Sequence, residues 1–548
     1  MSYIGIDLDN TLINYDTVFP AAANILNISL PPLVQTKKQI REFMRLQPEG
    51  EKKWQELQGI AYGKCLKEHA ALYPGVKRFF WRCAQNNHKV TVISHKTEYG
   101  HVDDEKNPLR KEALSFMKNQ CLTSTDNNSL IEIIFKDTRD DKISCISQHD
   151  FEWFIDDLPE VVDALDKLNK FKVIYFNPTS DKEIVASNDR VIPLTDWQQI
   201  DALINGDWTL EEAKVLIKKI INEEPKTIEK YTSGGNAATY RITMEDDRTL
   251  KLKVYPIDSK HDRLVSEFTG SKYMANIKSA TICKPIGQDK DLGAGVFEWV
   301  EGSSITDSSE NEIVLCLDFL KNLNEIREEP QFIDFQLASA ACLSGHDIEL
   351  QINNRLNRFL ENNIDSNEME LFLKKKFIPV SETILDWTQQ NWPEDIAFNV
   401  SVPRSEQILS PSDFGFHNTL RRPDGTLAFL DFEYFGWDDP VKLISDFSFH
   451  PGMNLSDKQI IFWINNSLEL YGKHLSNRLR VCRPLYGLIW CLILLNDFNP
   501  QFWHRRLLAN DMKQSSRVET LAGQLSKAEE LLDSINTNYT GTYWDIYH

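Results

Sequence analysis

Three polar side chains in the last third of the chain have the types and spacing that phosphoryl transfer requires. Asp413 is followed five residues later by the amide Asn418, and Asp431 ends the apolar run LAFLD. A carboxylate can take a proton from a hydroxyl group. An amide and a second carboxylate offer the oxygen ligands that magnesium prefers. This order predicts a site for Mg²⁺ and a nucleoside triphosphate.

A turn of small residues lies well before these groups. The stretch YTSGGNAATY places Ser233, Gly234 and Gly235 between two expected strands. Backbone N–H groups in such a turn can approach phosphate oxygens closely, although many hairpins also contain Gly-Gly. The turn lacks the GK[ST] of a Walker loop. We therefore interpret it as a candidate nucleotide-binding turn.

A lysine pair and a glutamate follow that turn. Lys251 and Lys253 lie two residues apart in LKLKVYP, so both point to one face of the expected strand. Glu267 lies in the helical pattern that comes next. A lysine in an apolar strand needs an anion, and Glu267 can orient it. We prefer Lys253 for the nucleotide, with Lys251 as the rival.

The order of turn, strand lysine, helix glutamate, Asp413, Asn418 and Asp431 resembles the protein-kinase-like arrangement. Asp-x4-Asn followed by LDFEYFGWDDP resembles the aminoglycoside phosphotransferase and choline kinase family, over about residues 226–535. The resemblance implies that Lys253 contacts the phosphates of ATP or GTP and pairs with Glu267. It also implies that Asp413 accepts the proton of a small-molecule hydroxyl, and that Asn418 and Asp431 hold Mg²⁺.

The sequence departs from that family directly before Asp413. Pro411 and Ser412 stand where the family commonly has His-Gly. Proline can brace the loop by fixing φ, so we expect the site to be active. His417 is interpreted as a loop-bracing histidine. Three further acids are expected to cap helices and brace the loop: Asp438, Asp439 and Asp446.

A second set of groups lies in the first two hundred residues. Asp7 and Asp9 in DLDNTL end an apolar strand, on the rim where parallel strands present ligands. One carboxylate can attack phosphorus. The other, kept partly protonated by its neighbour, can serve as acid and then base. The simpler alternative is an acid pair that caps a helix.

Later strand ends supply groups that suit the same rim. Ser94 ends VTVIS, Lys142 precedes the helix before FEWFIDD, and Asp156 and Asp157 end that strand. With DLDNTL they resemble the haloacid dehalogenase (HAD) superfamily, over about residues 2–201. The resemblance implies that Asp7 is the nucleophile and Asp9 the acid and base. Ser94 and Lys142 would bind phosphate, and Asp156 and Asp157 would complete a magnesium site with the aspartate pair. His95 and Lys96 are weaker candidates for the pocket.

The elements that must position these groups form two domains. We expect an α/β protein with a Rossmann-like HAD parallel sheet over 1–206, carrying a small helical cap at 17–72 without a clear strand. A linker helix at 207–224 leads to a bilobal α+β protein-kinase-like domain at 225–548, with lobes at 225–302 and 303–548. Four strands are expected in the first half: YIGIDLD, HKVTVISH, FEWFIDD and KVIYFN.

Composition limits the partners and the compartment. The chain has 548 residues and a net charge of −20, which suits neither nucleic acid nor an anionic membrane as a partner. The nine cysteines contain no CxxC pair, and the N-terminus has no signal-peptide pattern. LYGLIWCLILL is too short to span a bilayer and is expected to be a core helix. We expect a cytoplasmic protein, and the sequence does not indicate its oligomeric state.

These features predict a bifunctional enzyme that uses Mg²⁺ and ATP or GTP. One site would remove phosphate from an ester, and the other would phosphorylate a hydroxyl of a small molecule. Sugar-like or amino-alcohol metabolites are the leading substrate class, because both families include sugar-acting members. The alternative is that one domain is a non-catalytic sensor of nucleotide or phosphometabolite that regulates the other.

Overall fold

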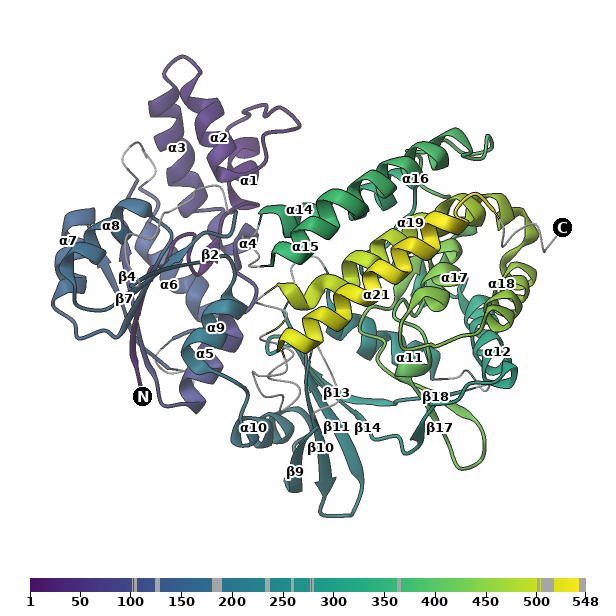
Figure 1. Cartoon of the computed structure of the whole chain (residues 1–548). Helices are drawn as coiled ribbons and strands as arrows, with labels where there is room; N and C mark the ends of the chain where they lie inside the picture. Colours follow the sequence, from purple (N-terminus) through teal and green to yellow (C-terminus); the bar gives the residue numbers. More distant parts are fainter. Residues whose placement is uncertain are drawn as a thin grey trace. The chain divides into compact units, whose positions relative to one another are not determined.

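The computed structural model divides the chain into two compact units, Met1–Glu212 and Ala213–His548. Each unit is described by itself (Figure 1). The structure describes residues 1–100, 102, 106–123, 129–179, 190–231, 237–257, 261–275, 277, 280–361, 366–499, 503 and 517–541.

The first unit is built on a six-stranded parallel sheet with the strand order β5-β4-β1-β6-β7-β8. The strands are β1 (Tyr3–Ile6), β4 (Lys89–His95), β5 (Leu130–Lys136), β6 (Trp153–Asp156), β7 (Lys172–Phe176) and β8 (Val191–Leu194). The sequence predicted only four of these six strands and missed β5 and β8. β5 was missed because most of its residues are partly or fully exposed, and β8 because it is short and contains Pro193.

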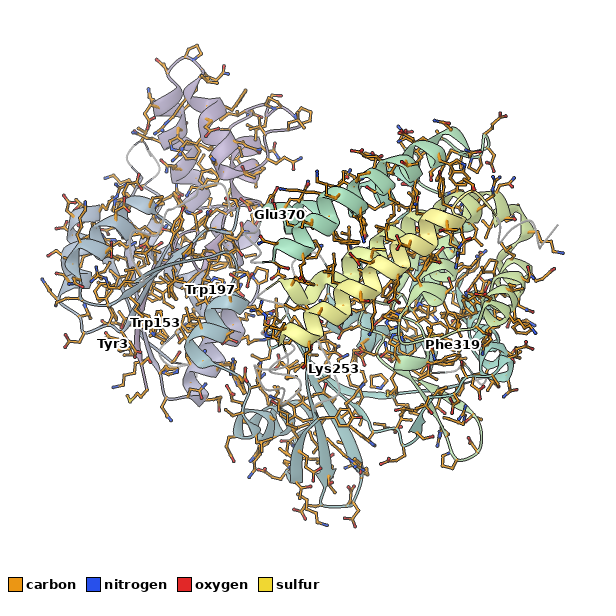
Figure 2. The ribbon with its side chains drawn as sticks, in the orientation of Figure 1. Tyr3, Trp153, Trp197, Lys253, Phe319 and Glu370 are labelled. Carbon is orange, nitrogen blue, oxygen red and sulfur yellow. The ribbon has the colours of Figure 1, made fainter. Side chains whose placement is uncertain are left out.

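Helices cover both faces of this sheet. They are α5 (Val76–Gln85), α6 (Leu109–Asn119), α7 (Arg139–Ser147), α8 (Pro159–Leu168) and α9 (Trp197–Asn205). Successive strand residues enter different cores: Phe154 belongs to one buried cluster and Ile155 to another. A strand that is buried on both faces reads as a continuous apolar run, which explains FEWFI and VTVIS. Trp153 and Trp197 are labelled within this unit in Figure 2.

The segment after β1 is mainly helical. It contains α1 (Val18–Ile25), α2 (Lys37–Arg45), α3 (Gly50–Tyr62) and α4 (Leu66–His69), with α1, α2 and α3 grouped together in Figure 1. Phe19 of α1 stacks on Trp54 of α3 at 5.1 Å between ring centroids. Two strands of two residues each, β2 (Ile13–Asn14) and β3 (Ala71–Leu72), pair antiparallel and join the start and the end of this helical segment. The expectation of no strand here was wrong in this detail.

A buried arginine holds the C-terminal part of the first unit through ion pairs with two acidic residues. The guanidinium of Arg82 lies 3.0 Å from Asp201 and 2.8 Å from Glu212, and all three side chains are almost fully buried. Glu212 belongs to the first turn of α10 (Leu210–Ile221). The division between the two units thus falls inside a helix rather than in a loop.

The second unit begins with a five-stranded antiparallel sheet in the order β13-β14-β11-β10-β9. Its strands are β9 (Pro225–Tyr231), β10 (Ala238–Met244), β11 (Thr249–Val254), β13 (Pro285–Asp289) and β14 (Ala294–Glu298). A π-helical turn, η1 (Val265–Thr269), runs directly into α11 (Gly270–Met274). Side chains on the central strand β11 alternate between the two faces of the sheet, which places Lys251 and Lys253 on the same face.

The rest of this unit is mostly helical. Its helices include α12 (Glu310–Ile326), α14 (Gly345–Glu361), α16 (Ile378–Gln390), α17 (Pro440–Phe449), α18 (Asp457–Tyr471), α19 (Ser476–Leu494) and α21 (Arg517–Asn538). Phe319, labelled in Figure 2, lies in their large shared core. Lys473–Phe498 is long and apolar enough to cross a membrane, but most of its apolar stretch is buried inside the protein, as expected of a core helix.

Short strands in the second unit flank the loops that carry Asp413, Asn418 and Asp431. A four-stranded sheet has the order β12-β18-β17-β15, and β16 pairs with β19. The strands are β12 (Thr281–Ile282), β15 (Ser303–Ser304), β16 (Ile408–Ser410), β17 (Thr419–Arg421), β18 (Leu427–Phe429) and β19 (Gly436–Asp438).

Candidate functional sites

A buried lysine joins two aspartates at the carboxyl end of the first sheet. The Nζ atom of Lys142, on α7, lies 2.7 Å from Asp7 Oδ1 and 2.6 Å from Asp156 Oδ2. The lysine side chain is 1% exposed, so these ion pairs are shielded from water. β1 and β6 are neighbours in the sheet, and this register brings the two aspartates to one rim.

Three carboxylates at this rim lie close together, and when ionised they carry more negative charge than Lys142 balances. Ligand oxygens of Asp7, Asp156 and Asp157 all lie within 4.8 Å of one another. Burial, opposed by Lys142 and reinforced by the neighbouring carboxylates, raises the pKa of Asp7 to about 7. Burial, with Asp7 and Asp156, also raises the pKa of Asp157, against Lys37 and Lys142. Hard carboxylate oxygens with uncompensated charge fit a magnesium ion.

Asp9 has a different environment from Asp7. Its carboxylate lies 3.0 Å from Lys96 Nζ, accepts a hydrogen bond from the Tyr15 hydroxyl, and lies 3.4 Å from Ser94 Oγ. Burial acts to raise the pKa of Asp9, but Lys96 and Tyr15 outweigh it and the net shift is downward. We expected Asp9 to be the partly protonated carboxylate. The structure places the raised pKa on Asp7, because Lys96 neutralises Asp9.

The helical insertion contributes groups that the sequence did not single out. Lys37 Nζ, on α2, lies 5.5–5.7 Å from the ring centroids of Tyr15, Phe19 and Tyr62. Lys96 Nζ lies 4.2 Å from the centroid of Tyr62. Two lysines and several aromatic rings thus stand beside Asp9. Nothing in the sequence pairs α2 with the rim, because their contact depends on how the insertion folds.

In the second unit, a strand lysine gathers three carboxylates. The Nζ atom of Lys253 lies 2.7 Å from Glu267, 2.9 Å from Glu433 and in direct contact with Asp431. Lys253 is labelled in Figure 2. Oxygens of Glu267, Asp431 and Glu433 lie within 4.8 Å of one another. Glu433 was missed, although its place two residues after Asp431 in LDFEYF could have indicated it.

The electrostatics of this group follow from burial and the lysines. Burial opposes ionisation of Glu267, but Lys251 and Lys253 lower its pKa to about 2. Burial raises the pKa of Asp431 to about 6, with Lys253 opposing and the neighbouring glutamates adding to the rise. Lys251 Nζ also lies 3.0 Å from Glu267. The two lysines differ in their partners: among the described residues, Lys253 forms an ion pair with Asp431, whereas Lys251 pairs with Glu267.

Glu267 lies in the π-helical turn η1. Such turns add a residue to a helix and are frequent at functional sites. Its second oxygen also accepts a hydrogen bond of 2.8 Å from the Tyr255 hydroxyl. The candidate phosphate turn with Ser233, Gly234 and Gly235 lies outside the described residues.

The loop after β16 holds Asp413 close to Asn418. Asn418 Nδ2 donates to the backbone oxygen of Asp413 at 3.0 Å and to its Oδ2 at 3.3 Å. The Leu430 N–H donates to the Asn418 backbone oxygen at 2.9 Å, in register with the β17–β18 pairing. This hydrogen bond brings Asn418 beside the residue that precedes Asp431. Burial opposes ionisation of Asp413, yet its histidine and asparagine partners lower its pKa overall.

Two residues of these loops adopt left-handed backbone conformations. Ser412 has φ 66° and Asp431 has φ 64°. Such values cost a non-glycine residue about 1–2 kcal/mol and cluster at functional sites. The family resemblance gives glycine at the position of Ser412, and the backbone here explains that preference.

The acids that follow Asp431 have three different roles. Asp439 accepts from the Val441 N–H at 2.9 Å and caps α17, as expected. Asp438 accepts instead from the backbone of Cys342 and Asp439. The expectation that Asp446 caps a helix was wrong. It lies within α17 and pairs with Lys442 at 3.0 Å.

Comparison with known proteins agrees with the geometry of the second unit. Residues 227–446 match the model of the phosphotransferase enzyme family. No curated protein matches the chain.

Three solved structures illustrate the similarity. The gentamicin complex of APH(2")-IIa is 19% identical, with a TM-score of 0.39, and the match covers 59% of this chain and 97% of that one. Spectinomycin phosphotransferase APH(9)-Ia is 13% identical, with a TM-score of 0.41 and coverages of 60% and 99%. Amicoumacin kinase is 12% identical, with a TM-score of 0.41 and coverages of 64% and 99%.

The family model begins after the first unit and ends at residue 446, so the family match describes part of the second unit. It does not identify the parallel sheet of the first unit as a HAD domain. Residues 227–446 of this chain form a phosphotransferase-family domain.

Proposed function

We propose that the second unit is an ATP-dependent kinase that phosphorylates a hydroxyl group of a small molecule. The observation that carries this proposal is the contact of Lys253 with both Glu267 and Asp431. Lys253 and Asp431 are 178 positions apart in the sequence. A lysine held by a helix glutamate beside a metal-binding carboxylate is the arrangement that positions nucleotide phosphates.

The residues divide the work in this proposal. Lys253 would bind the phosphates of ATP or GTP, and Glu267 would orient Lys253. Asn418, Asp431 and Glu433 would hold Mg²⁺, since all three offer hard oxygen ligands. Magnesium, when bound, would offset the negative charge of the phosphates. Asp413 would take the proton of the acceptor hydroxyl as its oxygen attacks the γ-phosphorus and the bond to the nucleoside diphosphate breaks.

We propose further that the first unit is a Mg²⁺-dependent phosphatase of the HAD type. Asp7 would attack the phosphorus of a phosphate ester and form an aspartyl-phosphate, while the alcohol leaves with a proton from Asp9. Asp9 would then take a proton from the water that hydrolyses the intermediate. Lys142 and Ser94 would bind phosphate oxygens. The support is the rim that joins Asp7, Lys142 and Asp156.

This proposal places one requirement on Asp9. The carboxylate is ionised and paired with Lys96 and Tyr15 in this structure. It must therefore take up a proton, or lose Lys96 to an incoming anion, before it can act as an acid. The α1–α3 insertion that carries Lys37 would close over the site and exclude water.

Sugar-like or amino-alcohol metabolites are the proposed substrates, and a protein with both sites could act on one metabolite in series or in opposition. The test uses wild type, Asp7→Asn and Asp413→Asn. Asp150→Asn and Asp386→Asn serve as matched controls, since both are exposed acids without an assigned role. Each protein is incubated with Mg-ATP and a polar metabolite extract, and changes in phosphate content are followed by mass spectrometry.

A phosphorylated compound that accumulates with Asp7→Asn and is absent with Asp413→Asn would show that the second unit is an active kinase and that its product is a substrate of the phosphatase. Loss of phosphate esters that depends only on Asp7 would leave the second unit as a nucleotide sensor. If neither variant differs from the controls, both catalytic assignments are wrong.

A further inference from the structure

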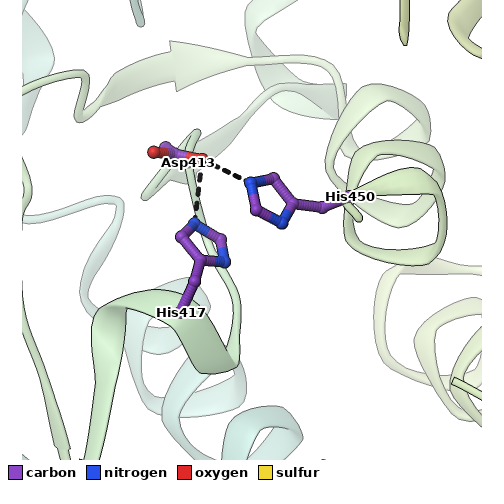
Figure 3. Close-up of side chains that lie close together, drawn as sticks. All are labelled: Asp413, His417 and His450. Carbon is purple, nitrogen blue, oxygen red and sulfur yellow. Dashed lines mark hydrogen bonds and ion pairs between the residues drawn. The ribbon is translucent and has the colours of Figure 1, made fainter. Parts of the chain in front are cut away.

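Two histidines from distant parts of the chain stack against each other beside Asp413. The rings of His417 and His450 have centroids 3.6 Å apart and planes inclined by 12°. Both Nε2 atoms face the same carboxylate oxygen, Asp413 Oδ1, at 3.0 Å and 3.8 Å (Figure 3). His417 belongs to the loop after β16 that also carries Asp413 and Asn418, whereas His450 directly follows α17.

The spacing of these three side chains would also fit a metal ion, since their ligand atoms lie within 4.8 Å of one another. The hydrogen bonding of His450 argues against this. The Gly452 N–H donates to His450 Nδ1 at 3.0 Å, so Nδ1 carries the lone pair. Burial and His417 lower the pKa of His450 to about 4, and the ring is neutral at pH 7. Its single hydrogen is therefore on Nε2, the atom that faces Asp413.

The stacking supplies a second argument. A metal bonds to imidazole nitrogen at about 2 Å, along the lone pair in the plane of the ring. Two nearly parallel rings 3.6 Å apart cannot both contain one ion in their planes. The geometry therefore suits one N–H donor, His417, and a second N–H group, His450, that faces the same carboxylate, and it does not suit metal ligation.

The environment of the pair holds it in place. His450 meets the ring of Trp490 edge-on, at 4.9 Å and 84°. The Trp490 Nε1–H donates to Asp446 Oδ1 at 2.8 Å, and Asp446 pairs with Lys442 at 3.0 Å. His450 is thus fixed by its backbone donor, by Trp490 and by His417. A ring that is this constrained can orient whatever its free N–H faces.

The contacts of Asp413 show what this orientation does. An ionised carboxylate only accepts hydrogen bonds, so His417 must donate its Nε2–H at 3.0 Å. His450 Nε2 faces the same Oδ1 from 3.8 Å, beyond hydrogen-bond distance, while among the described residues Oδ2 accepts the longer 3.3 Å bond from Asn418. Oδ2 thus keeps more capacity to accept a further hydrogen.

We propose that His417 and His450 are positioning residues that fix the Asp413 carboxylate, so that Oδ2 accepts the proton of the acceptor hydroxyl. This inference rests on the kinase function proposed above. Neither histidine exchanges a proton with the substrate. Phosphoryl transfer of this type depends mainly on placement of the groups, so a base that is held in place can serve although its own pKa is low.

The first test measures the histidine tautomer in the whole chain. The protein is labelled with ¹⁵N-histidine, and His450 is assigned by comparison with His450→Phe. The expected result at pH 7 is a neutral ring with hydrogen on Nε2, unchanged by one equivalent of Zn²⁺. Hydrogen on Nδ1, a charged ring, or a stoichiometric zinc shift would overturn the inference.

The second test separates N–H donation from ring packing. His450→Phe keeps a flat ring for the stack but has no donor, and His450→Gln restores an N–H near the Nε2 position. His346→Phe is the control, because His346 is about half exposed and pairs only loosely with Glu349, at 3.8 Å. The assay is MgATP hydrolysis with water as the acceptor.

We expect His450→Phe to lower kcat about 10- to 100-fold while KM for MgATP changes less than about twofold. His450→Gln should recover most of kcat. A wild-type kcat in His450→Phe, or equal losses in both variants, would overturn the positioning role. If the wild type transfers no phosphoryl group from MgATP while its histidines keep the expected tautomer, the kinase function itself fails and the pair is only a support of the loop.

Discussion

Lys253 Nζ lies 2.7 Å from Glu267 Oε2, and the two side chains are almost fully buried. The lysine comes from the central strand β11 and the glutamate from the π-helical turn η1. An ion pair in such a place is costly to form and more costly to break, because the remaining charge has no water to stabilise it. The pair holds Lys253 at Asp431, and this arrangement underlies the predictions for the second unit.

Replacement of Lys253 should abolish phosphoryl transfer more completely than replacement of Lys251. Lys253→Met removes the cation that contacts Glu267, Asp431 and Glu433, whereas Lys251→Met removes a cation that pairs with Glu267 and lies over the Phe297 ring. We expect a loss in kcat of about 100-fold or more for Lys253→Met and a smaller one for Lys251→Met. MgATP turnover measures both. Equal losses in the two variants would contradict the assignment of nucleotide binding to Lys253 rather than to Lys251.

Mg²⁺ without nucleotide should stabilise the chain through the first unit. Asp7, Asp156 and Asp157 gather more negative charge than Lys142 balances, and a divalent cation would relieve it. Thermal unfolding should show a rise in Tm with Mg²⁺ in wild type and Asp431→Asn, and no rise in Asp157→Asn. The shift should be larger at pH 8 than at pH 6, because protons compete for the raised-pKa carboxylates. A shift that survives in Asp157→Asn would place the ion elsewhere.

Asp438 should make stability depend on pH. Burial raises its pKa to about 7 from 3.8, so the folded state binds more protons than the unfolded state between these values. Stability from this group is present at low pH and falls as pH rises from about 4 to about 7. Asp438→Asn removes the titration, so the Tm of the variant relative to wild type should increase between pH 5 and pH 8. A difference in Tm that is constant over this range would contradict the raised pKa.

Ser412→Gly should stabilise the second unit. Ser412 has φ 66°, which costs a side-chain-bearing residue about 1–2 kcal/mol and glycine much less. Part of this gain is lost because glycine has a larger chain entropy in the unfolded state. We expect up to about 1 kcal/mol of added stability by urea unfolding, with kinase activity retained. Ser412→Val, which is branched at Cβ, should destabilise the protein, and a stable Ser412→Val would show that the backbone relaxes.

The sequence by itself determined the chemical groups and their order. Asp413, Asn418 and Asp431 are local features of loops that follow short strands, and their spacing could be recognised without a structure. The expected resemblance of this half to phosphotransferases is confirmed by the family match over 227–446. The parallel sheet of the first half was predicted from its continuous apolar strands, and it is present.

Only the tertiary structure decided which groups meet. Glu433 joins Lys253, His450 reaches Asp413 from the end of α17, and Lys96 neutralises Asp9. The position of Glu433 beside Asp431 and of Lys96 after a strand could mark them as candidates, but the sequence does not give their partners, because each contact joins residues whose distance along the chain is unrelated to their distance in space. The pKa values also depend on the tertiary structure. Asp7 and Asp9 are two residues apart, yet burial beside other carboxylates raises the pKa of Asp7, whereas Lys96, which directly follows β4, lowers the pKa of Asp9.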